Sequence, residues 1–282
     1  MNFKLIKSYA KINLSLGVIE KINPKYHKIE SLISFLYLYD EIKIKKIFDK
    51  KHKIKFFGKF SKNITKNNTV NRLLNLLDEQ NFLKEKKFEI KIIKNIPQKS
   101  GMGGGSMNAS SILKFFLKRK IINLSQKRMS SIMESIGSDV KLGMNFKNAI
   151  MSKTGKLTIN QKKLGLYTLV VKPNFGCSTR SIYSKIKVQT KPKYNNPKSS
   201  FFSIKNIINS SNDLEKAAFK VNPKLKKLKL FLSSLPNSMC VRMTGSGSCM
   251  VVYYLSKKKA IKGLRLFKKK YKNYWCIVSK TI

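Results

Sequence analysis

Acidic residues, histidine and cysteine are all scarce in this chain of 282 residues. Asp and Glu together number 13 against 60 Lys and Arg, which gives a formal net charge of +47. The two histidines, His27 and His52, and four cysteines without a C-x-x-C spacing do not make a zinc set. So few cysteines, scattered along the chain, indicate a reducing compartment.

Long apolar runs are missing as well. The most apolar window, 32–38, is far too short to span a bilayer. Lys4 and Lys7 interrupt the start of the chain, and no apolar segment of the signal-peptide type follows them. We therefore expect a soluble cytoplasmic protein without a membrane partner.

The positive charge is spread along the whole chain. Asn and Ile are abundant and Ala is scarce, which is typical of codon drift in an A+T-rich genome, whereas a nucleic-acid site concentrates its charge. The short basic clusters at 43–46, 50–53 and 268–270 are not interleaved with aromatic residues. We therefore expect no specific nucleic-acid partner, and we expect His52 to be exposed to solvent. A basic nucleic-acid-binding protein stays the alternative from another functional class.

A glycine-rich stretch at 101–106, Gly-Met-Gly-Gly-Gly-Ser, is the most informative feature. It follows an alternating apolar run at 88–92 and precedes a segment with helical periodicity at 112–117. A glycine loop between a strand and a helix is a phosphate-binding arrangement, because glycines let the backbone reach a ligand and the helix N-terminus attracts an anion. Ser106 is placed either to cap the helix or to reach a metal-bound phosphate oxygen.

The loop does not match the common nucleotide motifs. No Lys-Ser or Lys-Thr follows the last glycine, as a Walker loop requires. No acidic residue follows at the distance expected in a dinucleotide site, and the H-R-D and D-F-G sets of protein kinases are missing. The loop is therefore another class of phosphate cradle.

Strand and helix patterns are mixed along the chain. Asn68 or Thr69 is expected to cap one helix, Ser125 another that stops at Gly137, and Pro223 to break a helical region at 213–235. A polar segment at 185–200 is expected to be a surface loop. Without strict β-α-β order, the pattern predicts an α+β fold of two lobes, divided into 1–155 and 156–282. The predicted strands are 10–18, 41–45, 166–171, 240–243, 250–254 and 275–279.

Three further motifs accompany the loop: S-Y-A-K-I-N-L at 8–14, G-S-D-V at 137–140 and T-G-S-G-S-C at 244–249. In this order and spacing, over about residues 6–280, they resemble the GHMP small-molecule kinases. That family has P-x-x-x-G-L-G-G-G-S-S-N-A-A where this chain has P-Q-K-S-G-M-G-G-G-S-M-N-A-S at 97–110. The resemblance implies a ribosomal-S5-like N-terminal domain and a ferredoxin-like C-terminal domain.

The resemblance is closest to the GHMP branch that uses ATP to phosphorylate the 2-hydroxyl of 4-diphosphocytidyl-2-C-methyl-D-erythritol in the non-mevalonate isoprenoid pathway. It implies that Asp139 accepts the proton of the hydroxyl, while Lys11 keeps that carboxylate ionised and stabilises charge on the transferred group. Mg²⁺ is expected to bridge the ATP phosphates, with Ser106 as a contact and no carboxylate ligand identified. The expected ATP-binding residues are Pro97, Gly101, Gly103, Gly104, Gly105, Ser106 and Asn68.

Tyr26 and His27 resemble the family's G-Y-H segment, which holds the cytosine, and Tyr183 falls where the family has a second aromatic over the base. Stacking of this kind contributes about 1–3 kcal/mol per base. Asn13 is also expected to contact the substrate. The expected partner is a small molecule with a cytidine diphosphate moiety. Another GHMP kinase, acting on a sugar or on homoserine, stays the alternative within the enzyme class.

The chain departs from the family pattern at several places. Lys141 stands where Pro usually follows Asp-Val, and Met107 replaces a Ser in the glycine motif. Lys99 and Ser100 replace small residues before the loop, and Lys99 either adds a phosphate contact or obstructs the loop. These departures leave the expected fold unchanged, but they leave open a decayed, inactive kinase.

Overall fold

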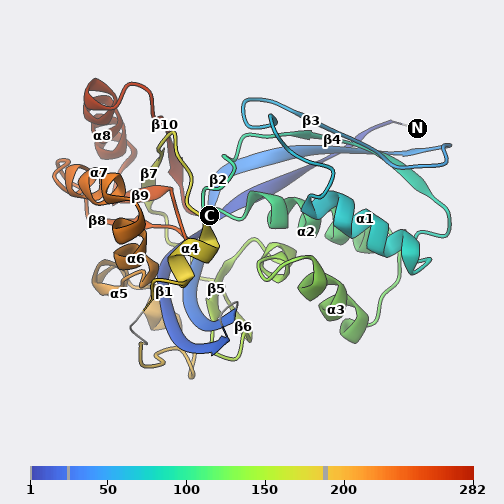
Figure 1. Cartoon of the computed structure of the whole chain (residues 1–282), viewed down its shortest axis with the longest axis horizontal. Coiled ribbons are helices and arrows are strands. Elements are labelled where there is room, and N and C mark those ends of the chain that lie inside the picture. The colour runs from blue at the N-terminus through green and yellow to red at the C-terminus, as the bar shows by residue number, and fades with distance from the viewer. Residues whose placement is uncertain (1, 24–25, 187–189) are drawn as a thin grey trace. The chain divides into compact units, whose positions relative to one another are not determined.

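The computed structural model describes residues 2–23, 26–186 and 190–282, and it divides into two compact units (Figure 1). The first unit comprises 1–10, 38–98 and 103–146, and the second comprises the rest. The long strands β1 (Lys4–Asn23) and β2 (Tyr26–Ile47) contribute residues to both units, so neither unit is continuous in sequence. The sequence pattern predicted two domains, 1–155 and 156–282. These compact units are defined by contacts and do not test that division, which stays a prediction.

In the first unit, β4 (Lys87–Ile93) lies between β2 and β3 (Lys53–Phe57), antiparallel to the former and parallel to the latter. Alternate residues of a strand share one face, so the isoleucine pairs Ile42–Ile92 and Ile44–Ile90 point the same way. They pack against the buried faces of three helices. These helices are α1 (Thr69–Glu79), α2 (Gly104–Lys118) and α3 (Gln126–Ile136).

Helix ends in the first unit follow the capping signals, with one exception. Asn68 caps α1, Ser125 caps α3, and α3 ends at Gly137, as predicted. The prediction that Ser106 caps α2 is wrong, because the helix begins at Gly104, with Gly103 as its N-cap at φ +67°. Since Gly103 has a left-handed conformation, the glycine run enters the helix directly. A 3₁₀ helix, η1 (Val140–Met144), follows Asp139.

His52, predicted to be solvated, is instead packed inside the first unit. Its side chain is 7% exposed, and its ring stacks on Phe88 with centroids 6.0 Å apart. The Phe88 amide donates to His52 Nδ1 over 3.1 Å. The prediction was wrong because it relied on the lysines that neighbour His52 in the sequence. The ring itself packs on Phe88 of β4 and is shielded from water.

The second unit contains an antiparallel sheet in the order β10-β7-β9-β8, formed by β7 (Tyr167–Lys172), β8 (Cys240–Met243), β9 (Met250–Tyr254) and β10 (Trp275–Lys280). Helices α6 (Leu214–Val221) and α7 (Pro223–Ser233) separate β7 from β8, and α8 (Lys257–Lys270) separates β9 from β10. This β-α-β-β-α-β order is the predicted ferredoxin-like arrangement. Pro223 is the first residue of α7, where a missing N–H costs no hydrogen bond.

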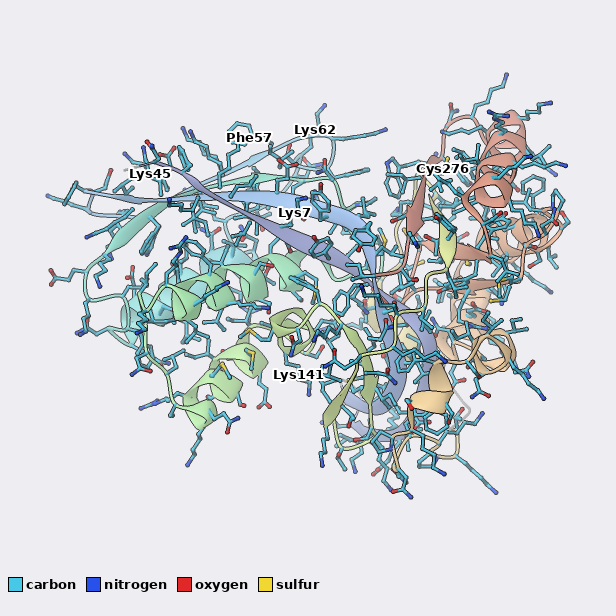
Figure 2. The ribbon with its side chains drawn as sticks, turned by 180° about the vertical axis from the view of Figure 1, so that it is seen from behind. Lys7, Lys45, Phe57, Lys62, Lys141 and Cys276 are labelled. Carbon is cyan, nitrogen blue, oxygen red and sulfur yellow. The ribbon has the colours of Figure 1, made fainter. Side chains whose placement is uncertain are left out.

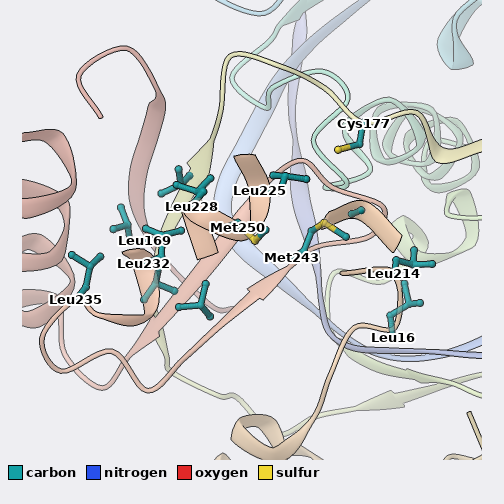
Figure 3. Close-up of a cluster of buried hydrophobic side chains, with 14 of the residues drawn as sticks. Leu16, Leu169, Cys177, Leu214, Leu225, Leu228, Leu232, Leu235, Met243 and Met250 are labelled. Carbon is teal, nitrogen blue, oxygen red and sulfur yellow. The ribbon is translucent and has the colours of Figure 1, made fainter. Parts of the chain in front are cut away.

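The core of the second unit joins this sheet to its helices (Figure 3). Leu169 and Met250 of the sheet pack with Leu214, Leu225 and Leu228 of α6 and α7. The remaining elements of the unit are short. They are β5 (Asn148–Met151), β6 (Leu157–Asn160), α4 (Thr179–Tyr183), η2 (Ser199–Phe202) and α5 (Ile204–Asn209). In the segment predicted as a surface loop, 185–200, the described residues 185–186 and 190–198 lie outside helices and strands, and η2 begins at Ser199.

Lysine side chains extend from many separate places. Lys45, Lys62 and Lys141 mark three such places in the first unit (Figure 2). Within the described ranges, no helix has both the length and the apolar character needed to cross a membrane.

Candidate active site

The N-terminus of α2 begins within the glycine loop. The Gly103 cap supplies no side-chain hydrogen bond, and the first turn of the helix contains no acidic residue. The positive end of this 15-residue helix is therefore not neutralised by its own side chains. Such an end, reached through glycines, suits an anion such as the phosphate of a nucleotide.

The start of α1 lies against the same loop. The Thr69 hydroxyl donates to the Gly105 carbonyl oxygen over 2.7 Å, and a Cβ on Gly105 would lie 3.0 Å from that hydroxyl oxygen. Asn68 Oδ1 accepts from the amides of Val70 and Asn71, at 3.0 and 3.1 Å. The capping role of Asn68 is therefore confirmed, while its contact with adenine stays a prediction.

The segment that carries Asp139 packs on the first turns of α2. A Cβ on Gly143 would lie 2.8 Å from Ser110 Cβ, which is too close for any side chain there. A Cβ on Gly137 would lie 3.6 Å from Ser106 Oγ. Two residues after Gly137, the half-buried Asp139 precedes η1. The first unit thus brings the Asp139 segment to the glycine end of α2.

A buried ion pair lies beneath the loop in the first unit. Lys94 Nζ contacts Asp40 Oδ2, and both side chains are almost completely buried. Asp40 Oδ1 also accepts from the amides of Asn95 and Ile96, each at 2.8 Å. A Cβ on Gly104 would lie 3.4 Å from Lys94 Nζ. The pair therefore supports the backbone that leads to the buried Pro97 and the first residue of α2.

Lys11 and Asn13 form a buried pair on β1, in the second unit. Lys11 Nζ donates to Asn13 Oδ1 over 2.9 Å, and the two residues are 5% and 3% exposed. Asn13 Nδ2 donates to Ser31 Oγ on β2 over 2.8 Å. These bonds fix the rotamer of Asn13 and hold the lysine amine beside its amide oxygen.

The turn between β8 and β9 is fastened to this pair. The Gly245 amide donates to Asn13 Oδ1 over 2.9 Å, and the Asn13 amide donates to Thr244 Oγ1 over 3.2 Å. Asn212 Nδ2 donates to the carbonyl oxygens of Met243 and Gly245, both at 2.8 Å. The turn is therefore positioned by two buried asparagines.

Residues 99–102, which lead into the glycine loop, belong to the second unit and contact β1 and the same turn. The Lys11 amide donates to the Met102 carbonyl oxygen over 3.1 Å, and the Cys249 amide donates to that of Ser100 over 3.3 Å. Lys99 has φ +48°, and its side-chain stem runs along Gly176, where an added Cβ would lie 3.3 Å from Lys99 Cβ. The Lys99 stem thus packs on backbone of its own unit.

An aromatic pair lies elsewhere in the second unit. The rings of His27 and Tyr183 have centroids 4.8 Å apart, tilted by 41°. Burial, and secondarily the charge of Lys21, lowers the pKa of His27, so the ring is neutral at pH 7. Its Nδ1 is buried with no hydrogen-bond partner in the part of the chain that the structure describes. Tyr26 begins β2, but its side chain lies outside the described residues.

Sequence reasoning identified the glycine loop and the turn at 244–248, but it missed the polar residues that hold them. Ser31 bonds to Asn13, Asn212 bonds to the turn, and both are buried. Asp40 and Lys94 form the buried ion pair beside Gly104. Among these four residues, only Asp40 could have been noticed in the sequence, because it is a carboxylate that follows the apolar window at 32–38. Lys11 lies in the second unit and Asp139 in the first.

A metal site built from protein ligands alone is not present within the described ranges, where no three His, Cys, Asp or Glu side chains gather. Mg²⁺ in phosphoryl-transfer enzymes needs only one or two protein ligands, because the nucleotide phosphates supply others. Ser106, in the first turn of α2, fits that requirement.

Comparisons with known proteins agree with these motifs. Residues 68–153 match the model of the GHMP kinases N terminal domain. The chain is 51% identical, over all 282 residues and the whole of the relative, to a 4-diphosphocytidyl-2-C-methyl-D-erythritol kinase of Pelagibacter ubique (strain HTCC1062). It is 31% identical to the kinase of the same name from Anaplasma marginale (strain Florida), over 96% of this chain and 94% of that one.

Its fold is shared with a solved structure. The crystal structure of a 4-(cytidine 5'-diphospho)-2C-methyl-D-erythritol kinase superposes with a TM-score of 0.78 at 20% identity, over 98% of this chain and 99% of that one. With the family model and the full-length relatives, this confirms the α+β GHMP kinase fold expected from the sequence. The chain belongs to the 4-diphosphocytidyl-2-C-methyl-D-erythritol kinase family of GHMP kinases.

Proposed function

We propose that this chain transfers the γ-phosphoryl group of ATP to the 2-hydroxyl of 4-diphosphocytidyl-2-C-methyl-D-erythritol. ATP use follows from its membership of a kinase family. The observation that supports the proposal is the packing of the Gly137–Gly143 segment, which contains Asp139, on the N-terminal turns of α2. A general base beside a phosphate cradle is the arrangement that phosphoryl transfer to an alcohol needs.

Asp139 acts as the base that accepts the hydroxyl proton, and Lys11 stabilises negative charge on the transferred group. Phosphoryl transfer depends mainly on position and on neutralised charge. Support for Lys11 comes from its restraint, since the bond to Asn13 Oδ1 leaves the amine few orientations. Asn13 is held in turn by Ser31 and Gly245 and contacts the substrate.

The glycine loop holds the ATP phosphates. Gly101, Gly103, Gly104, Gly105 and Ser106 provide backbone amides and one hydroxyl, while Pro97 and Asn68 border the nucleotide. When bound, Mg²⁺ would neutralise charge on the phosphate oxygens, and Ser106 is the residue that would hold it. The first-turn amides of α2 bind phosphate through the helix dipole.

Tyr26, His27 and Tyr183 bind the cytosine. The His27–Tyr183 contact supplies a stacking surface, and the unpartnered Nδ1 of His27 supplies a polar group for a base edge. A base that stacks there gains about 1–3 kcal/mol. This cytidine recognition favours the proposed substrate over a sugar or homoserine.

An ADP-release assay with purified protein tests the proposal. Wild type should turn over the cytidine substrate and leave homoserine and simple sugars unused. Asp139→Asn should lower kcat by about 10²–10⁴-fold, the contribution of general-base catalysis. Glu134→Gln, an exposed change on α3, is the matched control and should leave kcat unchanged. Full wild-type activity in Asp139→Asn, or turnover of homoserine in preference to the cytidine substrate, contradicts the proposal.

A further inference from the structure

Residues 190–194 form a strap that lies on the β1–β2 strand pair of the second unit. The Thr190 amide donates to the Val18 carbonyl oxygen over 2.8 Å. Asp213 Oδ2 accepts from the Thr190 hydroxyl at 2.6 Å and from the Val18 amide at 2.8 Å. One carboxylate therefore joins the beginning of the strap to β1.

Glu30 fastens the other end of the strap. Its carboxylate, on a side chain that is 1% exposed, accepts from the amides of Lys193 and Tyr194 at 2.8–3.1 Å. Gly17 on β1 leaves the room for it, because a Cβ there would lie 3.3 Å from Glu30 Cγ. A buried carboxylate aimed at two successive amides is a specific anchor, since an unpaired charge in that position is costly.

The Tyr194 side chain of the strap extends to β1, where its hydroxyl contacts Ser15. Tyr194 is 6% exposed, and its ring meets Phe201 edge-on with centroids 5.1 Å apart. The hydroxyl lies 2.8 Å from Ser15 Oγ, within hydrogen-bond distance. Burial raises the pKa of the Tyr194 phenol, so it keeps its proton at physiological pH.

From Ser15 the polar contacts continue to Lys11. Ser15 Oγ accepts from the Leu32 amide at 3.0 Å, and the Ser15 carbonyl oxygen accepts from the Ser31 hydroxyl. Ser31 Oγ accepts from Asn13 Nδ2, and Asn13 Oδ1 accepts from Lys11 Nζ. Tyr194, Ser15, Ser31, Asn13 and Lys11 thus form one buried chain of contacts.

We propose that Tyr194 is a positioning residue, whose bond to Ser15 holds Ser31 and Asn13 and through them the amine of Lys11. The catalytic meaning of this inference rests on the function proposed for Lys11. The hydroxyl fixes the Ser15 rotamer that meets the Leu32 amide. Without that bond, the Ser15 side chain turns and the Leu32 amide loses its acceptor. The backbone at Ser31 and Leu32 then shifts, and Asn13 samples rotamers that release the lysine.

Tyr194→Phe, Ser15→Ala and the double variant test the proposal in the full-length protein. Each single variant should lower kcat for the cytidine substrate about fivefold, the effect of losing one buried hydrogen bond. The KM for ATP should change by less than about twofold, and the double variant should be no worse than either single one. Multiplying effects, or an unchanged kcat in Tyr194→Phe, overturn the inference.

Tyr253→Phe is the matched control. Tyr253 is also fully buried in the second unit, and its hydroxyl has no hydrogen-bond partner in the described structure. Removal of the Tyr253 hydroxyl takes away a buried phenolic oxygen but leaves the bond between Tyr194 and Ser15 in place. The kcat should therefore not change. An equal loss of kcat in Tyr253→Phe and Tyr194→Phe would show a general packing effect and overturn the positioning role.

A second measurement does not depend on turnover. In protein labelled with ¹⁵N-asparagine, the Asn13 side-chain amide signal should shift or exchange faster in Tyr194→Phe than in Tyr253→Phe. If Asn13 does not respond, Tyr194 does not hold it, and the inference fails whatever the substrate. If Asn13 responds but wild type does not phosphorylate the cytidine substrate, the positioning by Tyr194 stands and the proposed function fails.

Discussion

A Cβ atom on Gly101 would lie 1.9 Å from the carbonyl oxygen of Thr244. Gly101 also has φ +76°, a conformation that disfavours residues with a side chain. The Thr244 hydroxyl also donates to the Gly101 carbonyl oxygen over 3.2 Å, so the two turns of the second unit are in direct contact. The first glycine of the loop is therefore required by the protein's own packing before any ligand is considered.

We expect Gly101→Ala to destabilise the protein far more than a left-handed glycine alone would predict. The clash with Thr244 forces the two turns apart, and the bonds between residues 99–102 and the turn at 244–249 are lost. Urea unfolding should show a loss of more than about 3 kcal/mol, as for other severe packing changes. ATP turnover should fall with it.

Gly165→Ala is the control for that variant. Gly165 has φ +65°, but nothing lies within 4 Å of its added Cβ. It should lose only about 1–2 kcal/mol, the cost of the left-handed conformation. Equal losses in the two variants would mean that the contact with Thr244 contributes nothing.

The sequence predicted local structure better than it predicted long-range contacts. Asn68, Ser125 and Pro223 mark helix starts because capping and proline geometry act over a few residues. The start of α2 was misplaced because Gly103 caps it without a side chain. Ser31 and Asn212 could not be found, since each bonds to residues more than fifteen positions away.

Asp40→Asn should destabilise the first unit and weaken ATP binding. The change leaves the Lys94 ammonium buried without its charged partner, which typically costs about 3–5 kcal/mol. Since Lys94 Nζ faces Gly104, a displaced ammonium disturbs the first residue of α2. Urea unfolding and the KM for ATP measure the two effects.

The double variant Asp40→Asn with Lys94→Met distinguishes an unpaired charge from a lost packing contact. Because it removes the uncompensated ammonium, it should recover part of the stability lost in Asp40→Asn. A double variant as unstable as the sum of both single changes would show that the ion pair itself is not the source of the effect.

His52 should make stability depend on pH. Burial lowers its pKa below the usual value, against the opposing effect of Asp78, whose Oδ2 lies 3.1 Å from Nε2. Lys87 also faces the site through its bond to Asp78, and the Phe88 amide requires an unprotonated Nδ1. The unfolded chain therefore takes up the proton first, and the contribution of His52 is present above about pH 6.5 and lost as the pH falls toward the folded pKa.

The comparison of wild type with His52→Gln measures this contribution. The free energy of unfolding in urea should fall more between pH 7.5 and 5.5 in wild type than in the variant. His27→Gln provides the reference for the other histidine, whose pKa is also lowered by burial. Identical pH dependence in wild type and His52→Gln would assign the effect to other groups.

Lys99→Gly should stabilise the protein without weakening ATP binding. At φ +48°, Lys99 carries the conformational cost of about 1–2 kcal/mol that glycine avoids. Lost contact with Gly176 and a more flexible unfolded chain offset part of that gain, which leaves a net increase below about 1 kcal/mol. Because the stem packs on Gly176, we expect obstruction rather than a phosphate contact, so the KM for ATP should stay the same or fall. The control is Lys62→Gly, at an exposed site without positive φ, which should destabilise the protein slightly. A clear rise in the KM for ATP in Lys99→Gly would contradict the expectation and show that the Lys99 ammonium binds phosphate.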